Sequence, residues 1–289
     1  MSAAPAAWAD ASSVELASYY ERHMALRGGV AHGWTGRGAP RAMQPGMVQV
    51  GVGKDAWLAL RADGALLAWR DSADAAVALM RGVARFAAGD SGWFAIDRDA
   101  VLWHGTHLDG TAPPRRVAEG VADACIGDSA DYHVTRDGTL FAKGLAHRGQ
   151  YGDGKLTATP GFVATAHDAV AVRAHTGHAL HLRRDGTVMG AGGNRFGPLS
   201  HHGLGDKAER WGPIFSGAVA IATGSRHSLA IRADGSLWAW GGGFAIEPVP
   251  LMARVSAAAA GDTATIAIAA DGALWQWDGG GQPRRLAWP

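Results

Sequence analysis

The segment GSRHSLAIRADGSLWAWG (residues 224–241) decides the fold. Alternating apolar residues follow its opening glycine, as expected of a half-buried β-strand. Asp234-Gly235 then predicts a tight hairpin turn, because glycine tolerates the positive φ that such turns need. A second apolar segment follows with Trp238 and Trp240. The segment therefore predicts two antiparallel strands joined by a short turn.

Five further segments repeat this pattern when they are aligned on the aspartate of the turn. In every copy the first residue, a glycine except for His175, stands ten positions before that aspartate. Such self-similarity at a regular spacing is the sequence signature of a repeat architecture. The further copies are GKDAWLALRADGALLAW (53–69), GDSGWFAIDRDAVLWHG (89–105), GDSADYHVTRDGTLFAKG (127–144), HTGHALHLRRDGTVMGAG (175–192) and GDTATIAIAADGALWQW (261–277).

A seventh, shorter copy precedes these. HMALRGGVAHGW (residues 23–34) matches the pattern with two residues missing. The preceding Ser12-Ser13-Val14-Glu15 also fits a helical capping box, so a helix over residues 12–27 is the alternative. We favour strands because the repeat pattern continues into Trp34.

Each unit contains material for four strands. A stretch of small apolar residues such as VSAAAAG (255–261) precedes the glycine, and a Pro-x-x-apolar segment such as Pro160–Val163 ends the unit. Four strands repeated about seven times predict an all-β, seven-bladed β-propeller of four-stranded antiparallel blades. We expect one domain, closed by pairing of PRRLAW (283–288) with the N-terminal segment. The expected blades lie near residues 14–47, 48–82, 83–120, 121–168, 169–217, 218–254 and 255–289.

Composition limits the function. The formal net charge is +1, from 27 basic and 26 acidic residues, so no global field draws the chain to nucleic acid or to an anionic membrane. The single cysteine, Cys125, excludes an intrachain disulfide and argues against a Cys-based zinc site. The start of the chain lacks the pattern of a secretory signal, and no apolar run is long enough for a membrane span. We therefore expect a cytoplasmic protein, and a monomer.

The repeat resembles that of the regulator of chromosome condensation (RCC1) family, whose pattern is A-G-x-x-H-S-L-A-L, then D-G-x-L-x-x-W-G, then N-x-x-G-Q-L-G-x-G. The residues that carry the resemblance are 220–241, RGQYGDG (148–154) and GGNRFG (192–197). The resemblance implies a seven-bladed propeller, but family members include exchange factors for small GTPases, chromatin binders, light sensors and bacterial inhibitors of β-lactamase. The fold alone therefore says little about the task. Most repeats here are short, and the chain is rich in alanine and glycine, which is similar to the compact bacterial type.

Because antiparallel strands alternate in direction, their connections alternate between two faces. The loops after the innermost strands share one face with two long inserts, 145–159 and 193–213; we call this the insert face. Exposed aromatic and arginine side chains on such loops are typical anchors for a partner protein. For Trp211, packing beneath its own loop is the favoured alternative. The candidate partner-binding residues are Tyr151, Arg195, Phe196, His201, His202, Trp211, Asp90, Asp128, Asp131 and Arg226.

The opposite face, which we call the turn face, carries the Asp-Gly turns with an arginine beside most of them. Arg61 and Asp63 are an example. Local Arg–Asp pairing and turn formation explain this pattern better than an anion site does.

Three sequence motifs look like catalytic or metal sites, but each has a different explanation. GDSG (89–92) fills an ordinary repeat slot, and GQYGDGKL (149–156) has Leu156 where a phosphate loop needs Ser or Thr. His175, His178 and His181 have a helical ligand spacing but lie in a predicted strand. We therefore predict no catalytic residue, metal or cofactor.

These observations favour a non-enzymatic propeller that binds another protein through the insert face, as an interaction scaffold, inhibitor or immunity-like partner. Two alternatives stay open. One is an exchange-factor-like regulator of a small GTPase. The other is an enzyme or carbohydrate-binding propeller, in which carboxylates of the inner loops hold a ligand at the central opening.

Overall fold

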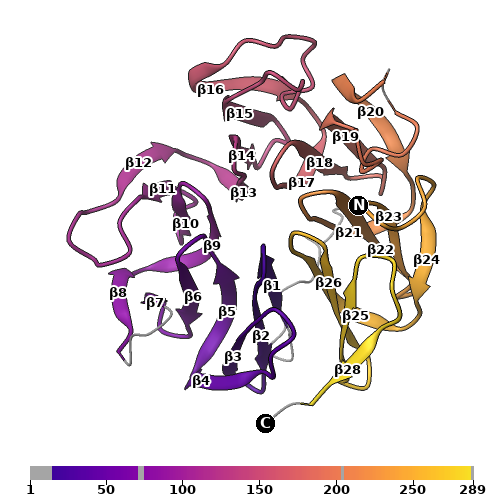
Figure 1. Ribbon diagram of the computed structural model, residues 1–289. Coiled ribbons are helices and arrows are strands. Elements are labelled where there is room, and N and C mark those ends of the chain that lie inside the picture. The colour runs from indigo at the N-terminus through magenta and orange to yellow at the C-terminus, as the bar shows by residue number, and fades with distance from the viewer. Residues whose placement is uncertain (1–14, 71–74, 203–204, 288–289) are drawn as a thin grey trace, which may run out of the picture.

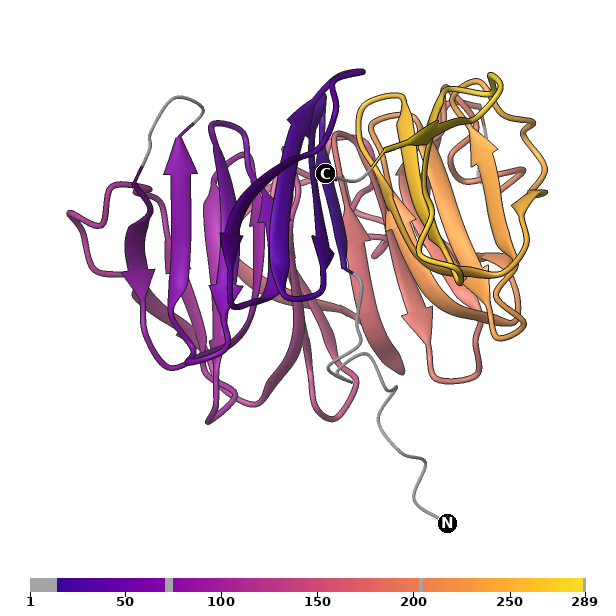
Figure 2. The ribbon, with the colours of Figure 1, turned by 90° about the horizontal axis from the view of Figure 1, so that it is seen from below.

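The computed structural model describes residues 15–70, 75–202 and 205–287. Over these residues the chain forms seven four-stranded antiparallel sheets, each built from four consecutive strands. The sheets stand as blades in a ring (Figure 1). Seen from the side, the strands run between two faces on which all the connections gather (Figure 2). The predicted seven-bladed, all-β propeller is confirmed.

Blades 1 to 4 occupy the first half of the ring. Their strands are β1 (Leu16–Tyr19), β2 (Arg22–Arg27), β3 (Val30–Thr35) and β4 (Arg41–Pro45); β5 (Met47–Val52), β6 (Ala56–Arg61), β7 (Leu66–Arg70) and β8 (Val77–Met80); β9 (Val83–Gly89), β10 (Gly92–Asp97), β11 (Leu102–Gly105) and β12 (Arg115–Ala118); and β13 (Val121–Ile126), β14 (Ala130–Thr135), β15 (Leu140–Gly144) and β16 (Thr159–Ala166).

Blades 5 to 7 complete the ring. Their strands are β17 (Ala169–Ala174), β18 (His178–Arg183), β19 (Val188–Gly193) and β20 (Lys207–Phe215); β21 (Ala218–Thr223), β22 (His227–Arg232), β23 (Leu237–Gly241) and β24 (Val249–Met252); and β25 (Val255–Ala260), β26 (Ala264–Ala269), β27 (Leu274–Asp278) and β28 (Arg284–Leu286).

The N-terminal region is strand, as favoured. β1 and β2 pair with each other over residues 16–25, so the helical alternative is wrong for residues 16–27. Residues 12–14 lie outside the described residues. In the described part of the chain, no helix is long and apolar enough to cross a membrane.

The predicted pairing of PRRLAW (283–288) with the N-terminal segment is not seen between the described strands. Within the described residues, β28 pairs with β27 of its own blade and β1 pairs with β2, so no strand of one terminus pairs with the other. Instead, the amide of Asp262 donates to the carbonyl oxygen of Tyr20, 3.2 Å away, and joins blade 7 to blade 1. The same bond joins blades 6 and 7, where Ser225 N lies 3.0 Å from Gly261 O. The seam between the first and last blades is therefore built like another junction of the ring.

This close approach explains the glycine that stands ten positions before the turn aspartate. A Cβ atom on Gly261 would lie 2.3 Å from the carbonyl oxygen of Tyr20 in the next blade. One on Gly224 would lie 2.4 Å from Gly261 O, and one on Gly89 would lie 2.5 Å from Ile126 O. In these blades the backbones of neighbouring blades touch at this position, so a side chain has no room. Blade 5, which has His175 there, is the exception.

Side chains of the innermost strands add a second set of bridges between blades. The Gln49 amide accepts a hydrogen bond from Phe86 N at 3.0 Å and donates one to Phe86 O at 2.9 Å. The carboxylate of Asp123 accepts one from Val172 N at 2.9 Å. These side chains satisfy backbone groups that the splayed inner strands leave without a ladder partner.

The hairpin turns on the turn face form as predicted. Asp234 Oδ1 accepts the amide of Ser236, 2.8 Å away, and Gly235 has a φ of 78°. The aspartate thus mimics a backbone turn, while the glycine supplies the left-handed conformation. Among the neighbouring arginines, Arg61 pairs with Asp63, whereas Arg232 stacks on aromatic rings.

Buried histidines cross the blade interfaces. His178 Nε2 lies 3.0 Å from the hydroxyl of Ser228, and His227 Nε2 lies 3.0 Å from that of Thr265. Burial lowers the pKa of His178 to about 3 and that of His227 to about 4. Both imidazoles are therefore neutral over the ordinary pH range and form hydrogen bonds between blades.

Replacing Gly261 by Ala should lower the free energy of unfolding by about 2–3 kcal/mol, because the new methyl group would push blade 7 away from blade 1. Gly161→Ala is the matched control: a Cβ there meets nothing within 4 Å, so we expect a change within about 0.5 kcal/mol. Urea unfolding of both variants provides the measurement. Equal stability of the two variants would disprove the steric explanation of the repeat glycine.

Acid should destabilise the fold through these histidines. The unfolded chain binds protons at imidazole below a pH of about 6.5, whereas folded His227 stays neutral until about pH 4. Stability is therefore lost as the pH falls through this window. His227→Gln, which keeps a side-chain amide near Thr265, should reduce the slope of unfolding free energy near pH 5 by about 1.2 kcal/mol per pH unit. Urea titrations from pH 7 to 4.5 measure the slope, with exposed His107→Gln as control; an unchanged slope for His227→Gln refutes the assignment.

Candidate functional site

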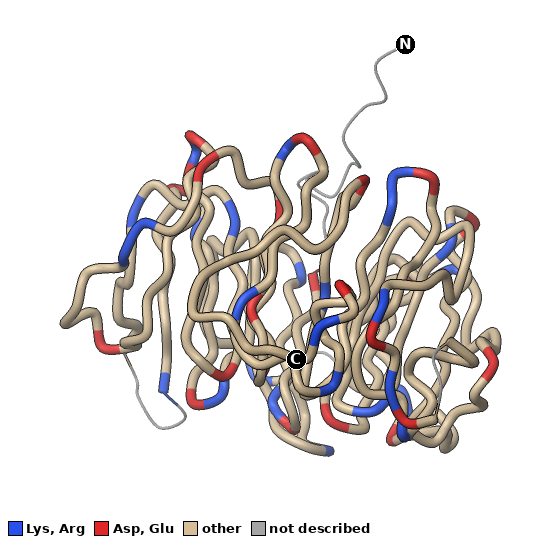
Figure 3. The backbone as a smooth tube through the Cα atoms, turned by 90° about the horizontal axis from the view of Figure 1, so that it is seen from above, with Lys and Arg blue, Asp and Glu red and all other residues tan. Residues whose placement is uncertain are grey.

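The insert face carries both long loops, as the alternation of strand direction predicts. The loop after β15 lies beside an inner loop of its own blade, since Leu145 N donates to Ser129 O at 2.7 Å. The loop after β19 reaches the next blade, where Gly242 N donates to Phe196 O at 2.9 Å. Acidic and basic residues are interspersed, mostly in the loops of the two faces (Figure 3). The inserts thus form one surface over blades 4 to 6.

Four residues at the tip of the second insert form what we call the Phe196 cluster: Arg195, Phe196, Arg226 and Ile246. The ring of Phe196 is 47% exposed, and the guanidinium carbons of Arg226 and Arg195 lie 4.9 and 5.7 Å from its centre. Ile246, 51% exposed, lies against the neighbouring Gly197. An exposed aromatic ring in contact with two guanidinium groups, next to an exposed aliphatic side chain, is therefore presented to solvent.

The edge of the cluster carries a contact between a histidine and a carboxylate. His201 Nε2 lies 2.7 Å from a carboxylate oxygen of Glu247, and both side chains are two-thirds exposed. Predicted candidates Arg195, Phe196, His201 and Arg226 are thus brought together. Ile246 and Glu247, from the loop after β23, were not predicted, because nothing in their own repeat marks them as neighbours of the insert.

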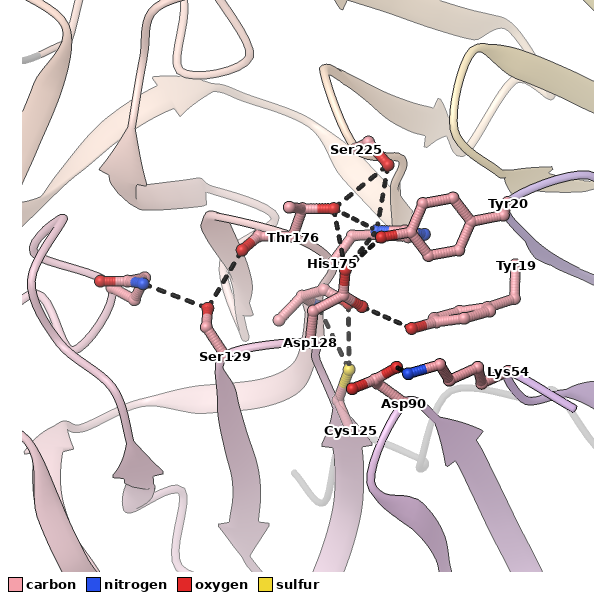
Figure 4. A network of polar contacts seen from close by, with 12 residues as sticks. Tyr19, Tyr20, Lys54, Asp90, Cys125, Asp128, Ser129, His175, Thr176 and Ser225 are labelled. Atoms are coloured by element: carbon pink, nitrogen blue, oxygen red, sulfur yellow. Dashed lines mark hydrogen bonds and ion pairs between the residues drawn. The ribbon is translucent and has the colours of Figure 1, made fainter.

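A network of polar side chains spans the central opening of the ring on the insert face (Figure 4). Asp128 of blade 4 accepts hydrogen bonds from the hydroxyls of Tyr19 at 2.6 Å and Tyr20 at 2.7 Å, both from blade 1. Thr176 donates to the same carboxylate at 3.0 Å. The ring of His175 stacks on that of Tyr19, with the centroids 5.0 Å apart. Side chains from opposite blades therefore meet across the central opening.

This network engages one carboxylate of the inner loops, that of Asp128. Burial and the Asp128 carboxylate raise the pKa of Tyr19 above its ordinary value, so its hydroxyl remains a donor. Asp90, a second carboxylate of the inner loops, pairs with Lys54 at 3.1 Å. A ligand at the axis would have to displace these bonds.

No group of three or more metal-ligating side chains comes together in the described part of the chain. The histidines with helical spacing point apart, because His178 contacts Ser228 of blade 6 while His181 packs edge-on against Trp211. Their separation follows from their place on a strand, where residues three apart face opposite sides.

Comparisons with known proteins agree with this geometry. Residues 218–244 match the model of the regulator of chromosome condensation (RCC1) repeat. Prp20p from Saccharomyces cerevisiae, studied for binding to Gsp1p and histones, superposes with a TM-score of 0.70 at 16% identity, over 86% of this chain and 80% of that one. Yeast RCC1 (Prp20) bound to Kap60 gives 0.72 at 17% identity, over 84% and 73%. The CRINKLY WD40 ectodomain of the Arabidopsis thaliana receptor kinase ACR4 gives 0.61 at 14% identity, over 96% and 98%.

The chain is a seven-bladed β-propeller, and its residues 218–244 match the RCC1 repeat. In this propeller the Asn-x-x-Gly part of the repeat, Asn194 to Gly197, has a structural task. The Asn194 amide donates to Ser200 O and His202 O at 3.0 and 3.1 Å, and its oxygen accepts the amide of Leu199 at 2.9 Å. The loop is thus fixed by its own asparagine, and Phe196 projects from a rigid base.

Tyr151 does not lie on the exposed surface of the propeller, contrary to prediction. Its side chain is 1% exposed and packs with Tyr132 and Trp211 in the core of blade 4. Its hydroxyl donates to Gly144 O at 2.7 Å. Gly149 and Gly152 have φ values of 82° and 65°, so the loop turns back and directs the ring inward.

Three more candidates lie beneath the surface or partly so. Asp131 is buried, pairs with Lys143 at 3.0 Å, and has a pKa raised by burial. Trp211 is half-buried and packs beneath the first insert, in contact with Gly152. It is therefore a packing residue, the alternative to a surface role that the sequence favoured. His202 is held by Arg210 O, 2.7 Å from its Nε2. These residues support the inserts rather than present a surface.

Tyr151→Ala should therefore destabilise the propeller by about 3–5 kcal/mol, because it empties a buried site and removes a buried hydroxyl partner. Phe196→Ala, at an exposed ring, should change stability by less than about 0.5 kcal/mol. Thermal and urea unfolding compare the two. A stable Tyr151→Ala variant would contradict the burial of this side chain.

Proposed function

We propose that this RCC1-repeat propeller binds another protein through its insert face, with the Phe196 cluster at the centre of the interface, as a non-enzymatic scaffold, inhibitor or immunity-like partner. The observation that carries the proposal is the exposure of Phe196 between Arg195 and Arg226 on a fixed loop. Aromatic and arginine side chains dominate the binding energy of protein interfaces. A rigid loop loses little conformational entropy on binding.

The side chains of the Phe196 cluster indicate which kind of protein surface would complement it. Phe196 and Ile246 offer an apolar centre, while Arg195 and Arg226 place two guanidinium groups around the ring. A complementary protein surface would have an apolar pocket rimmed by carboxylates, which guanidinium groups bind through paired hydrogen bonds. The structural neighbours add a general precedent, since yeast RCC1 has been seen bound to Kap60.

Quantitative affinity capture from the source cell tests the proposal. The intact propeller should retain one protein in stoichiometric amount, and Phe196→Ala and Arg226→Ala should each lower its recovery at least tenfold, as expected for hot-spot residues worth about 2 kcal/mol. Matched controls are Val219→Ala, an exposed apolar residue near the turn face, and Arg184→Ala, an exposed arginine of a hairpin turn. Both controls should retain the partner.

Electrostatics gives a second measurement on the same partner. Because the guanidinium groups lie at the surface, association should slow as salt is raised from 50 to 500 mM, and less so for Arg226→Ala. A partner that both Phe196→Ala and Arg226→Ala retain in full would remove the cluster from the interface.

A further inference from the structure

A groove of about 310 Å³ lies between blades 4 and 5, away from the Phe196 cluster. Its floor includes the end of β16 at Ala166, and its walls come from blade 5, with His181, Met189 and Trp211. The volume is at the small end of the range for small-molecule sites. The groove therefore has room for a compact organic molecule.

The groove coincides with a departure from the repeat. One position in the middle of the second strand of each blade faces the preceding blade. Five of the seven blades have alanine at this position; in blade 6 it is Ala230, which pairs with Trp238 of the third strand. Blade 5 has His181 there, opposite Met189. The other alanines at this position are Ala25, Ala59, Ala95 and Ala267, and blade 4 has His133. Packing of a blade therefore does not require an imidazole at this position.

Two buried polar atoms of the groove lack partners. His181 is 2% exposed, and its Nδ1 makes no hydrogen bond; the indole nitrogen Nε1 of Trp211 is also buried and unpaired. Both residues line the groove and touch edge to face, with ring centroids 4.7 Å apart. A buried polar atom without a partner costs about 1–3 kcal/mol, so a bound group that pairs with both would be favoured. An indole nitrogen only donates, so that group must be an acceptor.

The charge of the lining agrees with an anionic acceptor. Arg183 and Arg210 both line the groove, whereas no carboxylate of the described residues does. Asp168 approaches Arg183 from outside at 3.4 Å, with a side chain 71% exposed, and so competes weakly in water. Burial lowers the pKa of His181 to about 4, which keeps its ring neutral.

We propose that this groove binds a carboxylate carried on an apolar stem. The two guanidinium groups, the indole N–H of Trp211 and the Nδ1–H of His181 would hold the carboxylate, while Met189, Ala166 and the indole ring would contact the stem. Free organic acids and the C-terminal carboxylate of a peptide share this chemistry. The proposal rests on the groove alone and does not depend on the partner of the insert face.

Titration of the ¹⁵N-labelled full chain with 3-phenylpropionate tests it. The indole N–H signal assigned to Trp211, by its loss in Trp211→Phe, should shift in a saturable way below 10 mM. The uncharged 3-phenylpropionamide and inorganic phosphate should each bind at least tenfold more weakly, since one lacks the charge and the other the stem. Absence of a saturable shift, or equal binding of the amide or of phosphate, would overturn the proposal.

Two variants assign the residues. His181→Ala restores the alanine of the repeat and should fold normally, while Arg210→Ala changes a largely exposed side chain; each should weaken 3-phenylpropionate at least fivefold. Arg184→Ala, one residue beyond the groove arginine, is the control and should bind as the unmodified chain does. Retained affinity in both His181→Ala and Arg210→Ala contradicts the site.

Titration with acetyl-Gly-Phe, which has a free C-terminal carboxylate, identifies the source of the carboxylate. Tighter binding than that of 3-phenylpropionate indicates the C-terminus of a peptide, and weaker binding indicates a small organic acid.

Discussion

The contact on which the ring depends is the approach of neighbouring backbones at the end of each innermost strand. At the seam, the carbonyl of Tyr20 accepts the amide of Asp262, and no Cβ fits at Gly261. The blades must come this close because seven wedge-shaped sheets meet around one axis. This contact joins neighbouring blades at the start of the inner loops, which also carry Asp128 of the polar network at the axis.

Much of the architecture could be read from the sequence because the constraint repeats. A glycine excluded from having a side chain, and an aspartate that imitates a turn, appear at the same spacing in blade after blade. Ring closure could not be read in the same way. The bond that closes the ring joins a backbone amide to the backbone carbonyl of Tyr20, and such a bond leaves no trace in residue type. The predicted pairing of the chain ends is not seen between the described strands, where the bond from Asp262 to Tyr20 joins blades 7 and 1.

The candidate site was predictable to the extent that it lies within one loop. Arg195 and Phe196 stand at the tip of an insert whose face follows from strand direction, and both are exposed. Ile246 comes from the next blade, and only the packing of two blades brings it to Gly197. Tyr151 shows the opposite failure, since its loop was identified correctly but the side chain turns inward. Strand alternation fixes the face of a loop, and local glycine conformations decide where its side chains point.

A repeat also provides a reference state against which single residues can be judged. Equivalent positions of the seven blades have the same packing surroundings. A residue type that differs from that of most blades at such a position therefore needs another explanation. Alanine closes the blade interface at Ala230 and at four further positions, so an imidazole with an unpaired nitrogen at His181 is a cost that packing does not require. The second insert is a departure of the same kind. It ends in β20, whose Arg210 and Trp211 form a wall of the groove, and Arg210 O holds His202 of the insert at 2.7 Å. His181 meets the second insert through its contact with Trp211. Blade 4 carries the first insert and has His133 at the same position, so the departures from the repeat gather in these two neighbouring blades.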